Sequence, residues 1–450
     1  MSGATTADVH DRSTAARGHG PTAGLAALEP LMDKCVHCGF CLATCPSYLV
    51  LGQEMDSPRG RIYMMKAAVH DRLDLAEHMA GHIDTCLGCL ACETACPSGV
   101  KYAPLIEETR ATLERYTPRS AWDRLFRQLL FEVLPYPARL RVLALPMGLA
   151  RIVQGVPALL RRLPARLRAL IVLAPDGGVS RDVPERTAAA GPARRRVGLL
   201  TGCVQRVFFG SVNEATIRVL AAEGCEVIAP RAQGCCGALA LHAGQASDAR
   251  AFARALIAEF ERHELDTIVV NAAGCGSTMK EYGDLLADDP AWAERARRFS
   301  SRVRDVTEVL AELEPRAPRH PLPLRIAYHD ACHLAHGQGV RTPPRTLLAA
   351  IPQTTIVPIG EADVCCGSAG IFNLVQPEMA ATLGARKAGH IRDTGADLVV
   401  TSNPGCILQI RASQPAEGAR PVRHIVEVLD ASIRGADAGT LTRAARATIE

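Results

Sequence analysis

The stretch CVHCGFCLATCP at residues 35–46 returns as CLGCLACETACP at residues 86–97. Both copies have the pattern C-x2-C-x2-C-x3-C-P, in which a proline follows the fourth cysteine. A cubane iron–sulfur cluster needs four converging thiolates, and the two-residue spacing lets one tight loop supply three of them. The fourth thiolate must come from elsewhere. The eight cysteines of the two runs are Cys35, Cys38, Cys41, Cys45, Cys86, Cys89, Cys92 and Cys96.

The two runs should share their ligands. In proteins with two such runs, the last cysteine of each run binds the cluster of the other run. Zinc ribbons also use C-x2-C pairs, but zinc gives no reason for the third cysteine of each run or for the prolines. We therefore expect two 4Fe-4S clusters, one on Cys35, Cys38, Cys41 and Cys96, and the other on Cys86, Cys89, Cys92 and Cys45.

The residues between the runs predict a helix. Ser57 is a favourable N-cap, Pro58 suits the first helical position, and RGRIYMMKAAVHDRL follows. The cysteine motifs should therefore lie on loops between helices. Arg59 and Arg61 could raise the potential of a nearby cluster through their charge, but we expect them to solvate the helix surface instead.

Two glycines lie inside the cysteine runs. Gly39 and Gly88 lack a side chain, so each can let backbone amides approach the sulfur atoms of a cluster. Hydrogen bonds of this kind tune the reduction potential of a metal centre.

The later cysteines form an internal repeat. TGC, GCCG and AGCG in the first copy correspond to DACH, CCGS and NPGC in the second, and corresponding cysteines are 129 to 131 residues apart. Such a constant period indicates a duplicated domain. The first copy holds Cys203, Cys235, Cys236 and Cys275, and the second holds Cys332, Cys365, Cys366 and Cys406.

Each copy alternates short β-rich runs with helical runs, which predicts parallel strands in an α/β fold. The expected strands are RRVGLL, CEVIAP and DTIVVN in the first copy and RIAYH, TTIVPI and DLVVTS in the second. The repeated cysteines follow these strands, so they should gather at the carboxyl edge of each sheet. Cys225 instead opens a strand and is expected to be an ordinary buried thiol.

Composition sets limits on location and partners. The chain has 450 residues, 17 cysteines and a formal charge of +4. No basic stripe with aromatics points to nucleic acid, and no export signal is visible, so we expect reduced thiols in a cytoplasmic protein. An arginine-studded apolar stretch from Pro137 to Pro175 should be helices packed on protein, although contact with the inner face of the cell membrane remains open.

We therefore expect a mixed fold: an α-helical ferredoxin domain followed by two duplicated α/β, parallel-sheet, cysteine-rich domains. The expected parts are a disordered tail (residues 1–26), the ferredoxin domain (27–110), a helical linker or packing region (111–195), the first cysteine-rich domain (196–318) and the second (323–435).

The motifs CVHCGFCLATCP, SPRGRIYMMK, CLGCLACETACPSGVKY, GCCG and CCGSAGIFNLVQPEMA together resemble the iron–sulfur subunit of bacterial glycolate oxidase. The resemblance runs from about Leu31 to near the C-terminus. It implies an oxidoreductase acting on CH–OH groups, in which a separate FAD subunit oxidises glycolate to glyoxylate. This chain would pass the electrons toward a quinone or similar acceptor and would not be catalytic alone.

Several alternatives remain open, because the motifs report clusters rather than substrates. The partner could oxidise D- or L-lactate or glycerol 3-phosphate. A thiol–disulfide reductase of the heterodisulfide-reductase type is a further alternative, but the final C-x-x-C of that family is incomplete here, with Thr278 and Gln409 in place of cysteine. A redox sensor is disfavoured by the lack of a DNA-binding motif.

The cysteines of the repeats leave open a further iron–sulfur or metal site. Four thiolates in each copy suffice for a cluster in number, or they could be buried structural thiols. His333 and His336 lie near Cys332 and could be ligands or proton donors, but we expect them on a helix surface.

Overall fold

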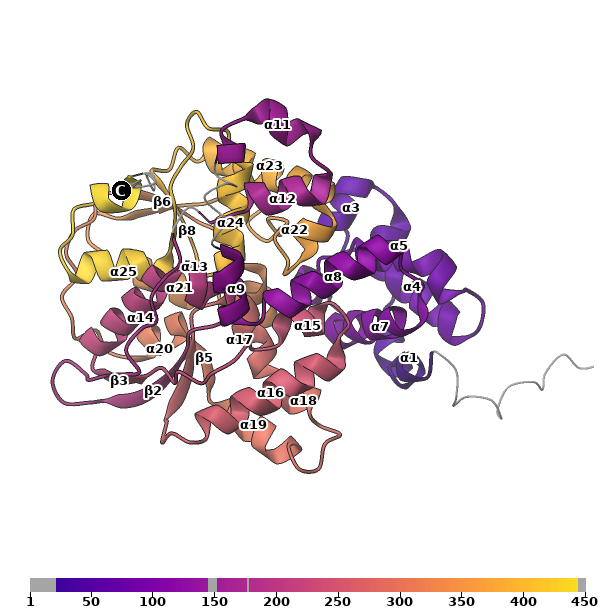
Figure 1. The fold of residues 1–450 in the computed structure, drawn as a ribbon, viewed down its shortest axis with the longest axis horizontal. Helices are drawn as coiled ribbons and strands as arrows, with labels where there is room; N and C mark the ends of the chain where they lie inside the picture. Colours follow the sequence, from indigo (N-terminus) through magenta and orange to yellow (C-terminus); the bar gives the residue numbers. More distant parts are fainter. Residues whose placement is uncertain (1–21, 145–151, 176–177, 444–450) are drawn as a thin grey trace, which may run out of the picture.

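The computed structural model describes residues 22–144, 152–175 and 178–443. The helical N-terminal part lies at one side of two α/β repeats (Figure 1). The expected mixed fold is confirmed. Among the described residues, no helix combines the length and the apolar character that a membrane crossing needs.

Short helices separated by the cysteine loops build the N-terminal part. Its interior is filled by Leu25, Met65, Met79 and Leu105, all fully buried. The elements are α1 (Ala23–Ala27), α2 (Glu29–Met32), α3 (Pro46–Leu51), a 3-10 turn (Glu54–Asp56), α4 (Pro58–Val69), a π-helical turn (Leu75–Met79), α5 (Ala80–Asp84), α6 (Ala91–Ala95) and α7 (Tyr102–Tyr116).

Two domain limits differ from the expectation. Residues 1–21 of the expected tail lie outside the described residues, but Ala23–Ala27 form α1, which contacts α4 and α7. Residues Ala23–Ala27 belong to the helical part, because Leu25 is buried in the core of that part. Helix α7 runs through to Tyr116, across the limit placed at residue 110.

The predicted start of α4 is confirmed. The backbone N–H of Gly60 donates to Ser57 Oγ at 3.0 Å, and Pro58 occupies the first turn. A capped start with proline in the first turn leaves few unpaired N–H groups. The helix therefore begins at Pro58, just after the 3-10 turn Glu54–Asp56.

The region from 111 to 195 is helical only in part. It contains α8 (Ala121–Val133), α9 (Pro137–Ala144), α11 (Pro157–Arg162) and α12 (Ala165–Val172). Strand β1 (Arg186–Thr187) at its end pairs antiparallel with β3, so these residues belong to the first sheet. The sequence did not predict this because two residues carry no periodic signal.

The first repeat is a sheet in the order β1-β3-β2-β4-β5. All pairings except that of β1 are parallel. Its strands are β2 (Arg195–Leu200), β3 (Cys225–Ile228), β4 (Thr267–Val270) and β5 (Val303–Asp305), and its helices are α13 (Val204–Phe208), α14 (Gly210–Ala222), α15 (Ala238–His242), α16 (Ala246–Phe260), α17 (Ala273–Lys280), α18 (Tyr282–Leu285), α19 (Ala293–Ser301) and α20 (Val306–Glu312).

The second repeat has the parallel order β7-β6-β8-β9, which reproduces the order of β3-β2-β4-β5. Its strands are β6 (Arg325–Tyr328), β7 (Thr355–Val357), β8 (Leu398–Thr401) and β9 (Val422–His424). Its helical elements are a π-helical turn (His333–Gly337), α21 (Thr342–Ala349), α22 (Phe372–Val375), α23 (Pro377–Asp393), α24 (Pro404–Ser413), α25 (Ile425–Ile433) and α26 (Gly439–Thr442).

All six predicted strands are present and the predicted duplication is confirmed. Two further strands, β5 and β9, complete the two copies. One continuous apolar core includes Val197 and Val269 of the first sheet together with Ile326 and Val399 of the second. The two repeats therefore share an interior.

Candidate iron–sulfur centres

Four cysteines of the N-terminal part line one cavity. Cys86, Cys89 and Cys92 come from the loop between α5 and α6 and the first turn of α6, and Cys45 comes from the residue before α3. This is the set that the sequence assigns to the second cluster. Four soft donors from two segments, arranged around one space, fit a 4Fe-4S cluster. The ligand assignment stays a prediction, but the geometry supports it.

Polar groups surround two of these sulfur atoms. The backbone N–H of Gly88 donates to Cys86 Sγ at 3.4 Å, and the Tyr102 hydroxyl lies 3.9 Å from the same sulfur. Gly88 has φ +62°, a conformation that glycine adopts without strain. On the other side, Ser47 Oγ is 3.2 Å from Cys45 Sγ. Such contacts stabilise thiolates and tune a bound cluster.

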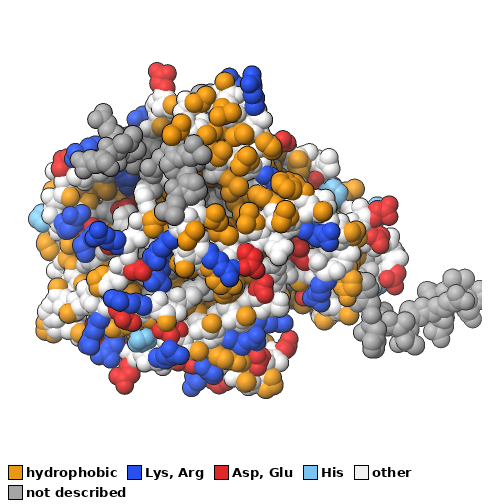
Figure 2. All heavy atoms as spheres, in the orientation of Figure 1, with side chains coloured by type: hydrophobic (Ala, Val, Ile, Leu, Met, Phe, Trp, Pro, Cys, Tyr) orange, Lys and Arg blue, Asp and Glu red, His pale blue; other side chains and the backbone are white. Residues whose placement is uncertain are grey.

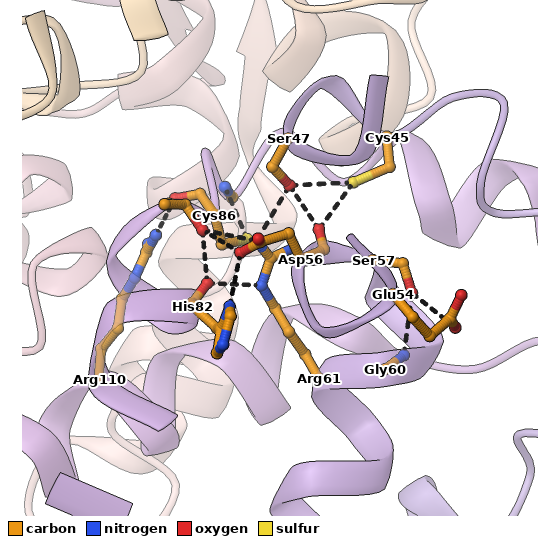
Figure 3. Close-up of polar contacts among 12 residues, drawn as sticks. Cys45, Ser47, Glu54, Asp56, Ser57, Gly60, Arg61, His82, Cys86 and Arg110 are labelled. Carbon is orange, nitrogen blue, oxygen red and sulfur yellow. Dashed lines mark hydrogen bonds and ion pairs between the residues drawn. The ribbon is translucent and has the colours of Figure 1, made fainter. Parts of the chain in front are cut away.

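Arg61 is buried beneath this cavity, with 1% of its surface exposed. Its guanidinium donates to Ser47 Oγ at 3.0 Å, to Thr85 Oγ1 at 3.0 Å and to the His82 carbonyl at 2.8 Å (Figure 3). The expectation that Arg61 solvates a helix surface is wrong, because its face of α4 packs inward. Its positive charge instead lies beside the cysteines.

The neighbouring Arg59 does lie at the surface. It forms an ion pair with Glu54 at 2.7 Å and donates to the carbonyl of His37 at 2.8 Å. Of the two arginines, only Arg61 can therefore act on the four-cysteine cavity from within the protein.

Charge lowers the pKa of one thiol in the cavity. Burial raises the pKa of Cys86, but the guanidinium charges of Arg61 and Arg110 outweigh it and hold the pKa below its usual range. Arg110 also donates to the backbone carbonyl of Cys86. Cys89 and Cys92 lack such compensation, and burial raises the pKa of both. Cations at this site therefore favour the thiolate form that a metal binds.

The cysteines assigned to the first cluster lie nearer the surface. Cys38 is exposed, and Cys35, Cys41 and Cys96 are half-buried. Two large apolar side chains flank Cys38, with Val36 66% exposed and Phe40 67% exposed. A cluster here would lie at the edge of the protein, whereas the second set lies inside it.

The repeat cysteines gather at the carboxyl edge of each sheet, as expected. In the first repeat, Cys203 and Cys235 have their sulfur atoms 3.7 Å apart, and the N–H of Gly237 donates to Cys235 Sγ at 3.4 Å. In the second repeat, the sulfur atoms of Cys332 and Cys365 are 3.9 Å apart. Cys225 is fully buried and lies in a strand, consistent with an ordinary thiol.

The N-terminal part and the second repeat meet at their cysteines. Cys89 packs in one apolar cluster with Cys332 and Cys365, together with Leu87 and Phe372. The sequence did not show this contact, because it depends on how the parts dock. It brings the inner four-cysteine cavity next to the thiols of the second repeat.

The histidines of this region differ from the expectation. His333 is 8% exposed and its Nδ1 lies 3.5 Å from Cys332 Sγ, so it is not a surface residue. Burial lowers its pKa to about 3. His336 is half-buried and contacts Thr94 Oγ1 at 2.9 Å. The sequence missed a third histidine, His329, which lies with Cys366 and Cys406.

A second cavity adjoins the first. Its lining includes Cys86 and Arg110 of the N-terminal part, His242 of the first repeat, and His333 and Phe372 of the second. The rings of His242 and His333 are 4.8 Å apart, and neither Nε2 atom has a hydrogen-bond partner among the described residues. Cys86 lines both cavities.

Comparisons with known proteins agree with this architecture. The model of the 4Fe-4S dicluster domain matches residues 31–100, and that of the cysteine-rich domain CCG matches residues 197–280 and 326–411. These matches confirm the expected iron–sulfur cofactors and the duplicated cysteine-rich domain.

Several relatives match over much of their length. The probable glycolate oxidase iron-sulfur subunit of Bacillus subtilis is 37% identical, over 90% of this chain and 94% of the relative. The glycolate oxidase iron-sulfur subunit of Escherichia coli is 33% identical, over 90% and 95%. Lactate utilization protein A of Exiguobacterium is 29% identical, over 53% of this chain and 99% of its own length.

The fold is similar to that of a solved structure. The crystal structure of a hypothetical protein from Helicobacter pylori superposes with a TM-score of 0.51 at 9% identity, covering 92% of this chain and 76% of the other.

Proposed function

The chain belongs to the family of glycolate oxidase iron–sulfur subunits, and from this membership we propose that it is the electron-transfer subunit of a flavin-dependent 2-hydroxy-acid dehydrogenase that oxidises glycolate. One observation carries the proposal: Cys86 lines both the four-cysteine cavity and the cavity between the domains. A thiolate ligand in that position would place a buried redox centre at the wall of the cavity between the domains.

The protein's part in this function is to hold and tune the centres. Two 4Fe-4S clusters, when bound, accept and release single electrons. Cys38 and its partners would hold the outer cluster at the surface, and Cys86 and its partners would hold the inner cluster inside the protein. Arg61 places a buried positive charge beside the inner set, which favours its reduced form. With both clusters bound, this charge would favour electron transfer from the surface inward.

A separate FAD subunit would supply the electrons. The sequence has no G-x-G-x-x-G fingerprint, so the hydride step belongs to a partner. We assign the docking face to the exposed residues Val36 and Phe40 beside Cys38. Exposed aromatic and aliphatic side chains next to a redox ligand are what such a contact needs.

We propose a quinone as the acceptor of electrons from the inner cluster. The cavity between the domains combines the apolar side chains Leu239, Ile371 and Phe372 with the imidazoles of His242 and His333. Burial keeps both imidazoles neutral by lowering their pKa values to about 4 and about 3. A neutral imidazole can donate to a carbonyl oxygen of a quinone through one ring nitrogen.

We further propose that the protein is cytoplasmic and contacts the inner face of the membrane. Figure 2 shows apolar side chains gathered over α8, α11 and α12 with basic residues among them. Trp122, Leu125 and Leu129 on α8 are more than half exposed, and Arg161 and Arg162 on α11 are exposed. Apolar anchors with arginines suit the boundary of an anionic bilayer, where quinones reside.

The experiment uses the chain purified anaerobically with its flavoprotein partner. We expect glycolate-dependent reduction of a soluble quinone to require this chain, and His333→Phe to lower quinone reduction while a surface dye is still reduced. His336→Phe is the matched control and should retain quinone reduction. Glycolate oxidation by this chain alone, or full quinone reduction without it, would refute the proposal.

Lactate is the second candidate substrate of the complex, because Lactate utilization protein A matches over nearly all of its length. Replacing glycolate with D- or L-lactate in the same assay distinguishes the two.

A further inference from the structure

The cavity between the domains needs a source of protons if a quinone is reduced in it. A quinone takes up protons as well as electrons, and iron–sulfur clusters carry electrons alone. Two carboxylates that line this cavity, Asp84 and Glu114, form ion pairs with Arg119 at 2.9 and 2.6 Å. An opposite charge favours the ionised form of a carboxylate, so these two side chains are poor sources of protons.

His242 connects the same cavity to another carboxyl group. It is the last residue of α15 and lines the cavity. Its Nδ1 atom lies 3.5 Å from Oε1 of Glu107 on α7, and its Nε2 atom has no hydrogen-bond partner among the described residues. The two ring nitrogens are distinct, so an imidazole can take a proton at one of them and release a proton from the other.

The backbone holds His242 against the helix that carries Glu107. Arg110 Nη1 donates to the carbonyl of His242 at 2.8 Å. In the turn that follows α15, a Cβ at Gly244 would lie 2.6 Å from the carbonyl oxygen of Arg110. Only glycine therefore allows this turn to approach α7 so closely.

Glu107 can exchange protons with water, because 22% of its side chain is exposed. Burial of the rest of the side chain raises its pKa to about 7, while the charge of Arg110 opposes this rise and that of Glu93 adds to it. The charge of Glu107 acts in turn on Glu281, which lies between α17 and α18. Near neutral pH a large share of the Glu107 carboxyl groups therefore carry a proton.

His242 has the properties of a shuttle for that proton. Burial, followed by the charge of Arg110, lowers its pKa to about 4, so the ring is neutral near pH 7. Its other neighbour is His333, whose ring lies 4.8 Å away and lines the same cavity. A neutral imidazole between a protonated carboxyl group and a cavity can accept on one side and donate on the other.

We propose that Glu107 and His242 form the proton path to a quinone in the cavity between the domains. His242 Nε2 releases a proton to a quinone oxygen, Nδ1 takes the proton of Glu107 Oε1, and water returns a proton to Glu107. Two such transfers, with the two electrons that glycolate supplies through the partner flavin and this chain, convert the quinone to a quinol. Glycolate and quinone thus yield glyoxylate and quinol. The proposal rests on the proposed function and names the residues that supply its protons.

The test uses the complete complex and compares two electron acceptors. Ferricyanide accepts an electron without a proton, so the ratio of quinone reduction to ferricyanide reduction reports proton delivery. Glu107→Gln should lower glycolate-dependent reduction of a soluble naphthoquinone about a hundredfold and retain ferricyanide reduction. Imidazole added to the solution should restore part of the lost rate, because it can carry protons in place of the carboxyl group. Glu108→Gln, on the same helix and 31% exposed, is the matched control and should leave both rates unchanged.

The pH dependence and the infrared spectrum give independent measurements. In the unmodified protein the ratio should fall as the pH rises through about 7, because Glu107 then loses its proton. The infrared band of a protonated carboxyl group should disappear over the same pH range and should be missing from Glu107→Gln. This band is measured without turnover. If Glu107→Gln does not fold, His242→Gln breaks the path at its other end and should show the same selective loss of quinone reduction.

The outcomes separate the proton path from the function on which it rests. Equal ratios in the unmodified protein and in either variant, or identical infrared spectra of the unmodified protein and Glu107→Gln, would overturn the proton path and leave electron transfer to a quinone intact. A complex that reduces ferricyanide with glycolate but never reduces the quinone would overturn the quinone as acceptor, and the path with it.

Discussion

Arg61 Nη2 lies 3.6 Å from Asp56 Oδ1, and the two side chains are only 1% and 4% exposed. Thr85 Oγ1 donates to the same carboxylate oxygen at 2.7 Å, and His82 Nδ1 lies 3.0 Å from it. A buried pair of this kind adds little net stability, but removing one partner strands the other charge. The carboxylate therefore holds the guanidinium in place, and the guanidinium charge acts on the cysteines above it.

We predict that Arg61→Gln lowers the reduction potential of one of the two clusters. A nearby positive charge favours the state with the additional electron, so losing it favours the oxidised state. Potentiometric titration followed by EPR should show one signal shifted to lower potential and the other unchanged. An unchanged pair of potentials would contradict the prediction.

The same substitution should lower stability by about 3–5 kcal/mol, because it removes the buried cation that faces the Asp56 carboxylate, which then keeps only Thr85 and His82 as partners. Arg61→Gln combined with Asp56→Asn removes the stranded charge and should recover much of this loss. Arg59→Gln is the matched control, since that residue lies at the surface and pairs with Glu54. It should change the free energy of unfolding by less than about 1 kcal/mol.

The docking face beside Cys38 gives a separate prediction. Phe40→Glu places a charge in a surface that the flavoprotein partner would cover, and the affinity for that partner should fall at least tenfold, as for an aromatic residue that anchors an interface. Iron content should not change, because the side chain is 67% exposed. Affinity is measured by titrating one purified subunit with the other.

Trp122→Glu is the reciprocal control, because this tryptophan is 71% exposed on α8 and belongs to neither cysteine run. It should leave the partner affinity unchanged and weaken sedimentation with anionic vesicles. If both variants weaken the same interaction, the two surfaces have been assigned wrongly.

Much of the fold could be predicted because its signals are local. The cysteine spacing, the Ser57 cap and the β-rich runs each act within a few residues, and the constant period between copies revealed the duplication. Strands β5 and β9 were missed because each has only three residues, which is too short to show the alternation typical of a strand. Helix α1 was missed because it has only five residues and a single buried one, Leu25, which is too short to show a helical period.

The sites were less predictable because they depend on packing between distant segments. Arg61 and Arg59 are two residues apart, and only the direction of α4 against its neighbours decides which of them is buried. His329 precedes Cys332 by three residues, but its approach to Cys366 and Cys406 depends on the strand order of the sheet. The sequence signal that could have singled out His329 is that Leu200 occupies the corresponding position of the first copy.

The shared core of the repeats predicts that they unfold together. Arg218 of α14 donates to both carboxylate oxygens of Asp430 on α25, at 3.0 and 2.8 Å. Asp430 is 3% exposed and also accepts from Arg434 at 3.0 Å, so Asp430→Asn weakens three charge-assisted bonds and should cost about 2 kcal/mol. Thermal unfolding should show one transition for both repeats, shifted to lower temperature.

Glu214→Gln is the control for this ion pair, because Glu214 is half exposed and lies 3.8 Å from the same arginine. It should leave the midpoint nearly unchanged. Two separate transitions, with only one of them shifted by Asp430→Asn, would show that the repeats are independent.

Glu281 gives a prediction about pH. Burial, followed by the charges of Glu107, Glu93 and Asp284, raises the pKa of Glu281 to about 8 from its ordinary value of 4.5. Between these two values the folded protein keeps a proton that the unfolded chain has released. Its contribution to stability is therefore complete below pH 4.5 and is lost as the pH rises toward 8.

Glu281→Gln should remove this dependence, because glutamine stays neutral. The variant should match the unmodified protein near pH 4 and exceed it near pH 9, by up to about 5 kcal/mol at about 1.4 kcal/mol for each pKa unit. The measurement is the difference in thermal midpoint between the two proteins at each pH, which cancels the titration of other groups. Asp284→Asn, on the exposed side of the same short helix, should reproduce only a small part of the gain. Equal differences at both pH values would mean that Glu281 is already ionised in the folded protein.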